Sequence, residues 1–386
     1  MSYARWIGGV ALVAAFGGCS SDAVEADANP IAASGLVPLL PGKGGNYETG
    51  PYEVVANWPK PIHDDFTWGR TASVWAVSPD RVFVYQSGEL PTLENPIGGG
   101  GTPIRPAASE GLGPNGCTCP VSVAETGRKG RWEHILMIFD REGNLVDSWD
   151  RHNALFARPH SVKTDPRDPE GHIWIVEDDG ASVYKFTADG ELVMTVGEFM
   201  VTGDNDDTAH FNHPTDIAFL SNGDFVISDG YQNTRVIKFD KDGNYVTHWG
   251  TRGTGPGQFN TPHGIAVDNN DRIYVSDRGN QRIQVFDANG THLDTWPNIR
   301  FPLSIMMSSD QYLWVNDGLA QKFLKFDLDG RLLYAWGTFG GEPGQMWGVH
   351  GFSVDQEGNL YTAEVWGGRA QKFTPRPGAD PALLIN

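Results

Sequence analysis

Three histidines, His160, His263 and His350, are the residues of this sequence best suited to hold one metal ion together. Each stands at the start of a short apolar segment, in the stretches RPHSV, TPHGI and GVHGF. Three neutral imidazoles that leave a fourth position open form the donor set of a catalytic zinc site. Other divalent transition ions also accept imidazole, so the ion could differ. A single histidine at a strand start is usually only a hydrogen-bonded residue, so the prediction depends on a fold that brings all three together.

A repeat of four short strands runs along the chain and would position these histidines. Its clearest copy spans residues 264–296 and contains four apolar segments separated by turns. The glycine of the third turn recurs at intervals of 47, 53, 47 and 40 residues, at Gly143, Gly190, Gly243, Gly290 and Gly330. Four antiparallel strands in a period of about 40–50 residues are typical of a β-propeller blade.

The two ends of the repeat region predict how a ring of blades closes. The last period has three strand-like segments between residues 351 and 374, and Tyr52–Trp58 near the other end supplies a fourth. The stretch from Gly255 to Asp268 resembles an NHL repeat. We therefore predict an all-β fold, a six-bladed β-propeller of the NHL type whose last blade is closed by an N-terminal strand.

Alignment of the repeats places one residue of each blade at the same end of the central channel. These residues are Ser73, His160, Asp216, His263, Ser304 and His350. The histidines fall in alternate blades, which lie about 120° apart in a six-fold ring. Their side chains are therefore predicted to converge on the axis.

The ends of the second strands form another ring of residues on the same face of the propeller. Aspartates recur there, and we expect their carboxylates to accept hydrogen bonds from the backbone of the following turn. Tyr231 and Arg278 depart from this pattern, and a phenol and a guanidinium at these positions would flank the metal. The alternative is a packed tyrosine and a surface arginine that pairs with a neighbouring aspartate.

These motifs resemble those of the peptidyl-α-hydroxyglycine α-amidating lyases, at Arg158–Ser161, Thr261–Gly264, Gly348–Gly351, Ser228–Arg235 and Ser276–Arg278. That family is a six-bladed propeller with three zinc histidines, a catalytic tyrosine and substrate-binding arginines. The resemblance implies zinc on His160, His263 and His350, and catalytic roles for Tyr231 and Arg278. It implies cleavage of the carbon–nitrogen bond of a carbinolamide, in a peptide or small-molecule substrate, to give an amide and glyoxylate. Tyr231 would remove the hydroxyl proton, and Arg278 would bind the substrate carboxylate.

Three positions depart from the family pattern. A second family arginine falls on Gln86 or Ser87, and Arg70 near the start of the same blade could substitute for it. The aspartate that binds a structural calcium in the family is replaced by Gly351, so a calcium ion stays an open expectation. A family cysteine next to the catalytic tyrosine is Gln232 here.

Two other functions fit the same fold. Three imidazoles with an open position also suit a metal-dependent hydrolase that activates water. A non-catalytic NHL module that binds proteins through one face is the other alternative, because a fold alone implies no activity.

The N-terminus predicts export. Residues 1–19 resemble a lipoprotein signal peptide that ends in Phe16-Gly17-Gly18-Cys19, with a plain signal peptide as the alternative. Residues 20–50 are expected to form a flexible tether, and residues 51–386 the propeller, with an insertion at about 88–130. Lipidation of Cys19 would place the chain in the bacterial cell envelope, on the periplasmic face or the outer membrane. Its contact with the membrane would be through the lipid anchor alone.

Cysteine usage and charge narrow the remaining partners. Cys117 and Cys119 are expected to form a local disulfide in an oxidising compartment, or else to act as a soft-metal pair. The net charge of −19 repels phosphate backbones and argues against nucleic acid as a partner. We expect the protein to be a monomer.

Overall fold

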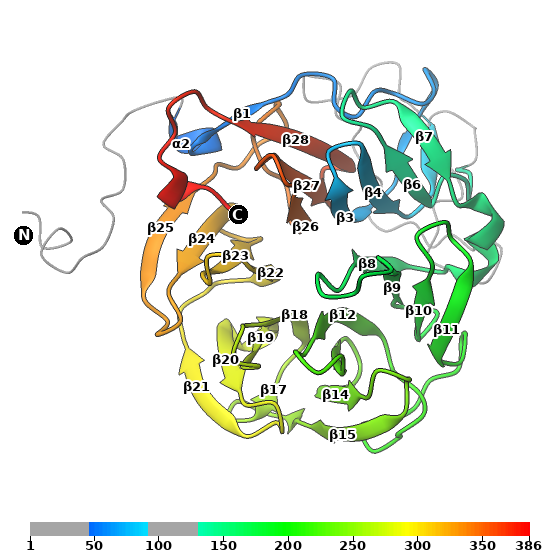
Figure 1. Cartoon of the computed structure of the whole chain (residues 1–386), viewed down its shortest axis with the longest axis vertical. Helices are drawn as coiled ribbons and strands as arrows, with labels where there is room; N and C mark the ends of the chain where they lie inside the picture. The colour runs from blue at the N-terminus through cyan, green and yellow to red at the C-terminus, as the bar shows by residue number, and fades with distance from the viewer. Residues whose placement is uncertain (1–45, 92–129) are drawn as a thin grey trace, which may run out of the picture. The chain divides into compact units, whose positions relative to one another are not determined.

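Six antiparallel sheets of four strands each surround a common axis in the part of the chain that the structure describes (Figure 1). This computed structural model describes residues 46–91 and 130–386. The first strand of each of blades one to five lies nearest the centre, and the chain then runs outward strand by strand. The predicted all-β, six-bladed propeller is therefore confirmed.

From the innermost to the outermost strand, blades one to three consist of β3 (Thr71–Ser78), β4 (Arg81–Gln86), β6 (Leu136–Phe139) and β7 (Leu145–Ser148); β8 (Pro159–Lys163), β9 (Ile173–Glu177), β10 (Ser182–Phe186) and β11 (Leu192–Gly197); and β12 (Pro214–Phe219), β13 (Phe225–Asp229), β14 (Arg235–Phe239) and β15 (Tyr245–Trp249). Blades four and five consist of β18 (Pro262–Val267), β19 (Ile273–Asp277), β20 (Arg282–Phe286) and β21 (His292–Trp296); and β22 (Pro302–Met307), β23 (Leu313–Asp317), β24 (Lys322–Phe326) and β25 (Leu332–Trp336). The described short elements outside the blades are β2 (Phe66–Trp68), β5 (Glu89–Pro91), β16 (Thr251–Arg252), β17 (Gln258–Phe259), α2 (Asn46–Thr49), η1 (Asp150–Leu155), η2 (Arg278–Asn280) and η3 (Pro381–Leu383).

The sixth sheet contains strands from both ends of the described chain. Its inner strands are β26 (Val349–Val354), β27 (Leu360–Glu364) and β28 (Arg369–Pro375), and its outermost strand is β1 (Tyr52–Val54). β1 pairs antiparallel with β28, with Val54 opposite Phe373. Strands far apart in the sequence thus share one blade.

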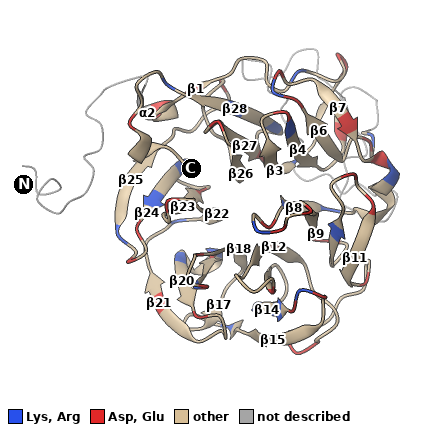
Figure 2. Cartoon of the chain, in the orientation of Figure 1, with Lys and Arg blue, Asp and Glu red and all other residues tan. Residues whose placement is uncertain are grey.

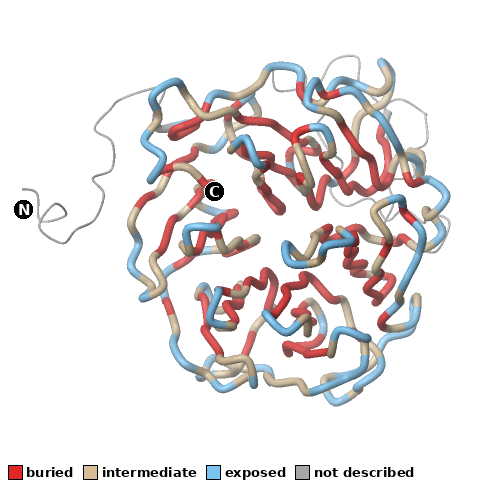
Figure 3. Tube along the Cα trace, viewed as in Figure 1, coloured by how far each residue is buried: buried red, intermediate tan, exposed pale blue. Residues whose placement is uncertain are grey.

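Apolar side chains between neighbouring blades form the core. The inner and middle strands are buried, whereas outer strands such as β11, β15 and β21 expose much of their surface (Figure 3). Trp149, at the end of the first blade, packs edge-on against Phe83 and contacts Phe186 of the second blade, with ring centroids 5.3 and 5.5 Å apart. Replacing a buried aromatic residue of this kind with alanine costs about 3–5 kcal/mol.

The turn glycines that mark the repeat have a packing role. Gly290 has a positive φ of 86°, and a β-carbon there would lie 2.5 Å from the ring of Trp249 in the preceding blade. Gly330 relates to Trp296 in the same way, with the same 2.5 Å approach. Only glycine satisfies both the backbone conformation and this close contact. The repeated glycine and tryptophan of the sequence are therefore one inter-blade contact.

Charged residues lie mainly in the loops and turns of the blades (Figure 2). None of the helices in residues 46–91 and 130–386 has the length and apolar character needed to cross a membrane. Cys19, Cys117 and Cys119 fall outside the described residues. Lipidation, the disulfide, the domain limits and the oligomeric state therefore stay predictions.

Candidate metal centre

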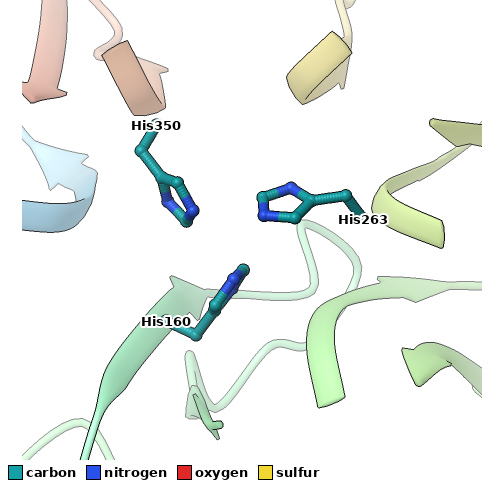
Figure 4. A group of neighbouring side chains, drawn as sticks. All are labelled: His160, His263 and His350. Carbon is teal, nitrogen blue, oxygen red and sulfur yellow. The ribbon is translucent and has the colours of Figure 1, made fainter. Parts of the chain in front are cut away.

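His160, His263 and His350 come together on the propeller axis. They are the second residues of β8, β18 and β26, and their rings point toward one another (Figure 4). The ring centroids lie 4.6–4.8 Å apart, and one nitrogen of each ring lies within 4.8 Å of the others. All three side chains are buried. We call these three residues the axial cluster.

A β-bulge at the start of each innermost strand aims these histidines at the axis. The register of β8 with β9 passes from Pro159 to Ser161 and leaves His160 out of the ladder. The same irregularity falls at His263 and at His350. A bulge redirects a side chain and is common beside functional sites.

The bulges also correct the sequence alignment in the other three blades. There the register skips Ala72, Thr215 and Leu303, one residue before the predicted Ser73, Asp216 and Ser304. A one-residue bulge is invisible in the sequence pattern, which explains the shift. Ser73 and Asp216 instead link neighbouring blades: they accept hydrogen bonds from the backbone of Val162 at 3.1 Å and of Ile265 at 3.0 Å.

Backbone carbonyls of the next blade set the tautomer of the histidines. Nδ1 of His263 bonds the carbonyl of Leu303 at 2.6 Å, and Nδ1 of His350 bonds that of Ala72 at 2.9 Å. Because the Nδ1 atom donates, the Nε2 lone pair of each ring is free to bind a cation. The matching carbonyl for His160 is that of Thr215, although Nδ1 of His160 makes no hydrogen bond of normal geometry.

The surroundings keep the axial cluster neutral. Burial lowers the pKa of His160 and His263 well below the usual range, and it lowers the pKa of His350 to about 4. Neutral imidazole is the form that binds metals. Three buried neutral nitrogens that face one point therefore fit a divalent transition ion such as zinc.

Tyr231 places its hydroxyl beside the axial cluster. The oxygen lies 3.2 Å from Nε2 of His160 and 3.0 Å from Nε2 of His263. A glycine must precede this tyrosine, because a β-carbon at Gly230 would lie 1.6 Å from the carbonyl oxygen of Pro262. The loop that follows β13 can therefore press against blade four and carry the phenol to the axis.

Two guanidinium groups flank the ring of Tyr231. The Cζ atoms of Arg278 and Arg158 lie 4.9 and 5.2 Å from the ring centroid, and Nη1 of Arg278 lies 3.4 Å from the hydroxyl. Burial raises the pKa of Tyr231, while the positive charges of Arg278 and Arg158 oppose this effect. The predicted placement of Tyr231 and Arg278 together near the histidines matches the geometry.

Arg278 begins η2 and also lies over the ring of Phe301, with its Cζ 4.9 Å from the centroid. Among the described residues, no carboxylate lies within ion-pair distance of this guanidinium. The alternative of a surface arginine paired with an aspartate therefore does not describe Arg278. Its charge is available to an anion in the cavity.

Arg70 is exposed and lines a cavity of about 180 Å³ together with His160, His350 and Tyr231. Gln86, in contrast, is fully buried and donates a hydrogen bond to the carbonyl of His134 at 2.8 Å. The blade-one position of the family arginine thus has a structural role here, whereas Arg70 reaches the cavity.

Sequence reasoning missed a charged network beside Tyr231. Nη2 of Arg158 lies 2.6 Å from a carboxylate oxygen of Asp178 and 3.1 Å from one of Asp179. Nδ1 of His213 lies 2.8 Å from Asp178, and the hydrogen bonds from Asp178 and Asp179 raise the pKa of His213 to about 9. The signals were present, since Arg158 directly precedes Pro159-His160 and Asp178 ends a second strand.

The calcium expectation meets a steric obstacle. A β-carbon at Gly351 would lie 2.8 Å from Cα of Ser73 and 3.0 Å from the carbonyl of Ala72. The backbone around position 351 therefore leaves no room for the aspartate that the family uses. No calcium ion enters the function proposed below.

Comparisons with known proteins agree with this architecture. A family model described as a 6-bladed β-propeller matches residues 204–329. A probable peptidyl-α-hydroxyglycine α-amidating lyase of Caenorhabditis elegans is 35% identical over 157 residues, which cover 40% of this chain and 43% of that protein. The chain is an NHL-type six-bladed β-propeller that resembles the amidating lyases.

Two further comparisons limit what this resemblance carries. The human NHL repeat-containing protein 3 is 32% identical over 179 residues, which cover 45% of this chain and 51% of that protein. The chain thus matches about half the length, or less, of these two relatives. A gluconolactonase structure from Xanthomonas campestris has a TM-score of 0.53 and 14% identity, and covers 86% of this chain and 92% of that one. At this identity the likeness concerns the fold alone.

Proposed function

We propose that this protein is a metal-dependent lyase that cleaves the carbon–nitrogen bond of a carbinolamide to give an amide and glyoxylate. The observation that carries the proposal is the position of the Tyr231 hydroxyl, 3.2 and 3.0 Å from Nε2 of His160 and His263. A phenol within hydrogen-bond reach of the reacting atoms is a candidate proton acceptor. Relatives named as amidating lyases support the same chemistry.

His160, His263 and His350 would hold the metal ion, with zinc as the first candidate. A bound divalent ion would supply Lewis acidity and make a nearby hydroxyl more acidic. The histidines contribute no negative charge, because burial and their Nδ1 hydrogen bonds keep them neutral.

Tyr231 would move the proton of the reaction. As the phenolate it would accept the proton of the substrate hydroxyl; the carbon–oxygen double bond then forms as the carbon–nitrogen bond breaks. The same proton would return from Tyr231 to the leaving amide nitrogen, so that the residue ends as it began. Arg278 and Arg158, on either side of the ring, would stabilise the phenolate that this step requires.

Arg278 would bind the carboxylate of the substrate, which becomes the carboxylate of glyoxylate. Its guanidinium can make a two-pronged ion pair, and no described carboxylate competes for it. Arg70 lines the same cavity and would supply the second positive charge that the family places elsewhere in blade one.

The test uses N-benzoyl-α-hydroxyglycine as substrate and zinc-loaded full-length protein. We expect equal amounts of benzamide and glyoxylate above the rate without enzyme. Benzoate in place of benzamide would indicate a hydrolase, and neither product would favour a binding module; each outcome contradicts the lyase. Tyr231→Phe should lower kcat by about 10²–10⁴-fold, while Tyr245→Phe, which removes an exposed hydroxyl bonded to His248, should not change it.

A further inference from the structure

A second cluster of metal-binding side chains lies outside the axial site, in blade one. Oε1 of Glu89 lies 3.1 Å from Nδ1 of His134 and 3.5 Å from Nε2 of His63. The two imidazole rings are 5.4 Å apart, and one ligand atom of each residue lies within 4.8 Å of the others. We call His63, Glu89 and His134 the blade-one cluster. It shares no residue with the axial cluster.

One nitrogen of this cluster is buried without a hydrogen-bond partner. Nε2 of His63 is shielded from solvent and makes no hydrogen bond among the described residues, although it faces Glu89. A buried polar atom left in this state costs free energy and calls for a water or an ion nearby. The lone pair of His63, the Nδ1 of His134 and one carboxylate oxygen therefore face a common point.

The carboxylate of Glu89 is held in place for this role. The side chain is only 1% exposed, and its other oxygen, Oε2, pairs with the guanidinium of Arg131. Glu89 and Arg131 also exchange two backbone hydrogen bonds, of 2.8 and 2.9 Å. Arg131 thus occupies Oε2 and leaves Oε1 to the two histidines, as a second residue commonly does for a metal-binding carboxylate.

The histidines are held from different segments. His134 has a positive φ of 53°, and its backbone N–H donates to Asp150 at 2.9 Å. A non-glycine residue persists in this conformation only where its surroundings require it, and such residues gather at functional sites. His63 packs edge-on against Phe66, with ring centroids 6.4 Å apart.

We propose that His63, Glu89 and His134 bind a second divalent transition-metal ion, independent of the one on the axis. Two imidazoles and one carboxylate are an established donor set for zinc, and also for iron. Such an ion would join residues that precede positions 92–129 in the sequence to residues that follow them. The proposal does not depend on the lyase activity, since it concerns different side chains.

The test removes the axial site first and then counts zinc. Full-length His263→Ala protein is freed of metal, titrated with Zn²⁺ in a calorimeter, and analysed for zinc after dialysis. We expect one zinc per chain in this variant. Adding His63→Ala should weaken that binding by at least about 100-fold, since even residues behind the ligands cost 10–100-fold.

His248→Ala on the same background is the matched control, because His248 is a partly exposed histidine whose ring bonds only Tyr245 among described residues. It should keep the zinc. His134→Ala gives an independent second variant, and thermal unfolding verifies that each variant is folded. Zinc binding that is absent in His263→Ala, or that survives both His63→Ala and His134→Ala, would overturn the proposal.

Discussion

The axial and blade-one clusters present opposite environments to a cation. The axial cluster consists of three buried, neutral imidazoles with no carboxylate among them. The blade-one cluster has two partly exposed imidazoles and a buried carboxylate whose second oxygen already pairs with Arg131. An ion on the axis would keep its full charge for a substrate, whereas one in blade one would be partly neutralised by Glu89. The first environment suits catalysis and the second suits structural binding.

The two clusters also differ in how the fold builds them. Pseudo-symmetric strands deliver each axial histidine from the same bulged position, so that the ring itself supplies the convergence. The blade-one cluster takes His63 from the segment before β2, Glu89 from β5, and His134 from the segment before β6. Repetition creates the axial site, and contacts between non-repeated segments create the other.

The largest expected contrast between the clusters is catalytic. His160→Ala should lower kcat/KM for glyoxylate release by about 10³-fold or more, because loss of the bound ion removes several kcal/mol of stabilisation from the transition state. His248→Ala, far from either cluster in sequence and role, should stay within about two-fold of the wild type. Full activity of metal-free or His160→Ala protein would remove the catalytic distinction between the clusters.

A smaller effect is expected from the arginine beside each cluster. Arg278 has no described carboxylate partner, whereas Arg131 is paired with Glu89. Arg278→Gln should raise KM by about 10–100-fold, the loss of one charge-assisted interaction with the substrate carboxylate. Arg272→Gln is the control, since that guanidinium bonds Asp268 instead. An unchanged KM for Arg278→Gln would mean that the carboxylate binds elsewhere.

The smallest effect concerns His213, the charged histidine beside the neutral axial ones. Its pKa is raised from 6.5 to about 9 by Asp178 and Asp179. The resulting stabilisation is complete below pH 6.5 and is lost as the pH rises through about 9, because the folded state then releases its extra proton. With partial exposure taken into account, about 2 kcal/mol is at stake.

Urea unfolding of the wild type at pH 6 and pH 9.5 measures this difference. His213→Gln should abolish the part of the pH dependence that comes from this residue. If the variant and the wild type lose the same stability between these pH values, His213 is not charged in the folded protein.

The repeat made much of this architecture predictable. Turn glycines such as Gly290, the spacing of the strands and the alternate-blade histidines predict the ring and the axial cluster, because each is a local pattern repeated with one period. Tyr231 and Arg278 were also predictable, since both end a second strand on the same face. Bulges were not, because one extra residue leaves no trace in the sequence pattern, and the predicted positions Asp216 and Ser304 were therefore one residue away from the true ones.

The blade-one cluster and the Arg158 network lay beyond sequence reasoning. Glu89 and His134 are 45 residues apart and do not occupy equivalent repeat positions, so only the folded chain brings them together. Arg158 stands beside a recognised motif, but its contacts with Asp178 and Asp179 depend on the approach of two loops. Non-repeated contacts of this kind carry no periodic signal.

The position of bound zinc tests the central claim most directly. Crystals of zinc-loaded protein, measured above and below the zinc absorption edge, would give an anomalous difference peak for each ordered ion. We predict a peak on the propeller axis about 2.0–2.1 Å from one nitrogen each of His160, His263 and His350. Fully zinc-loaded crystals without a peak between these three imidazoles would contradict the account.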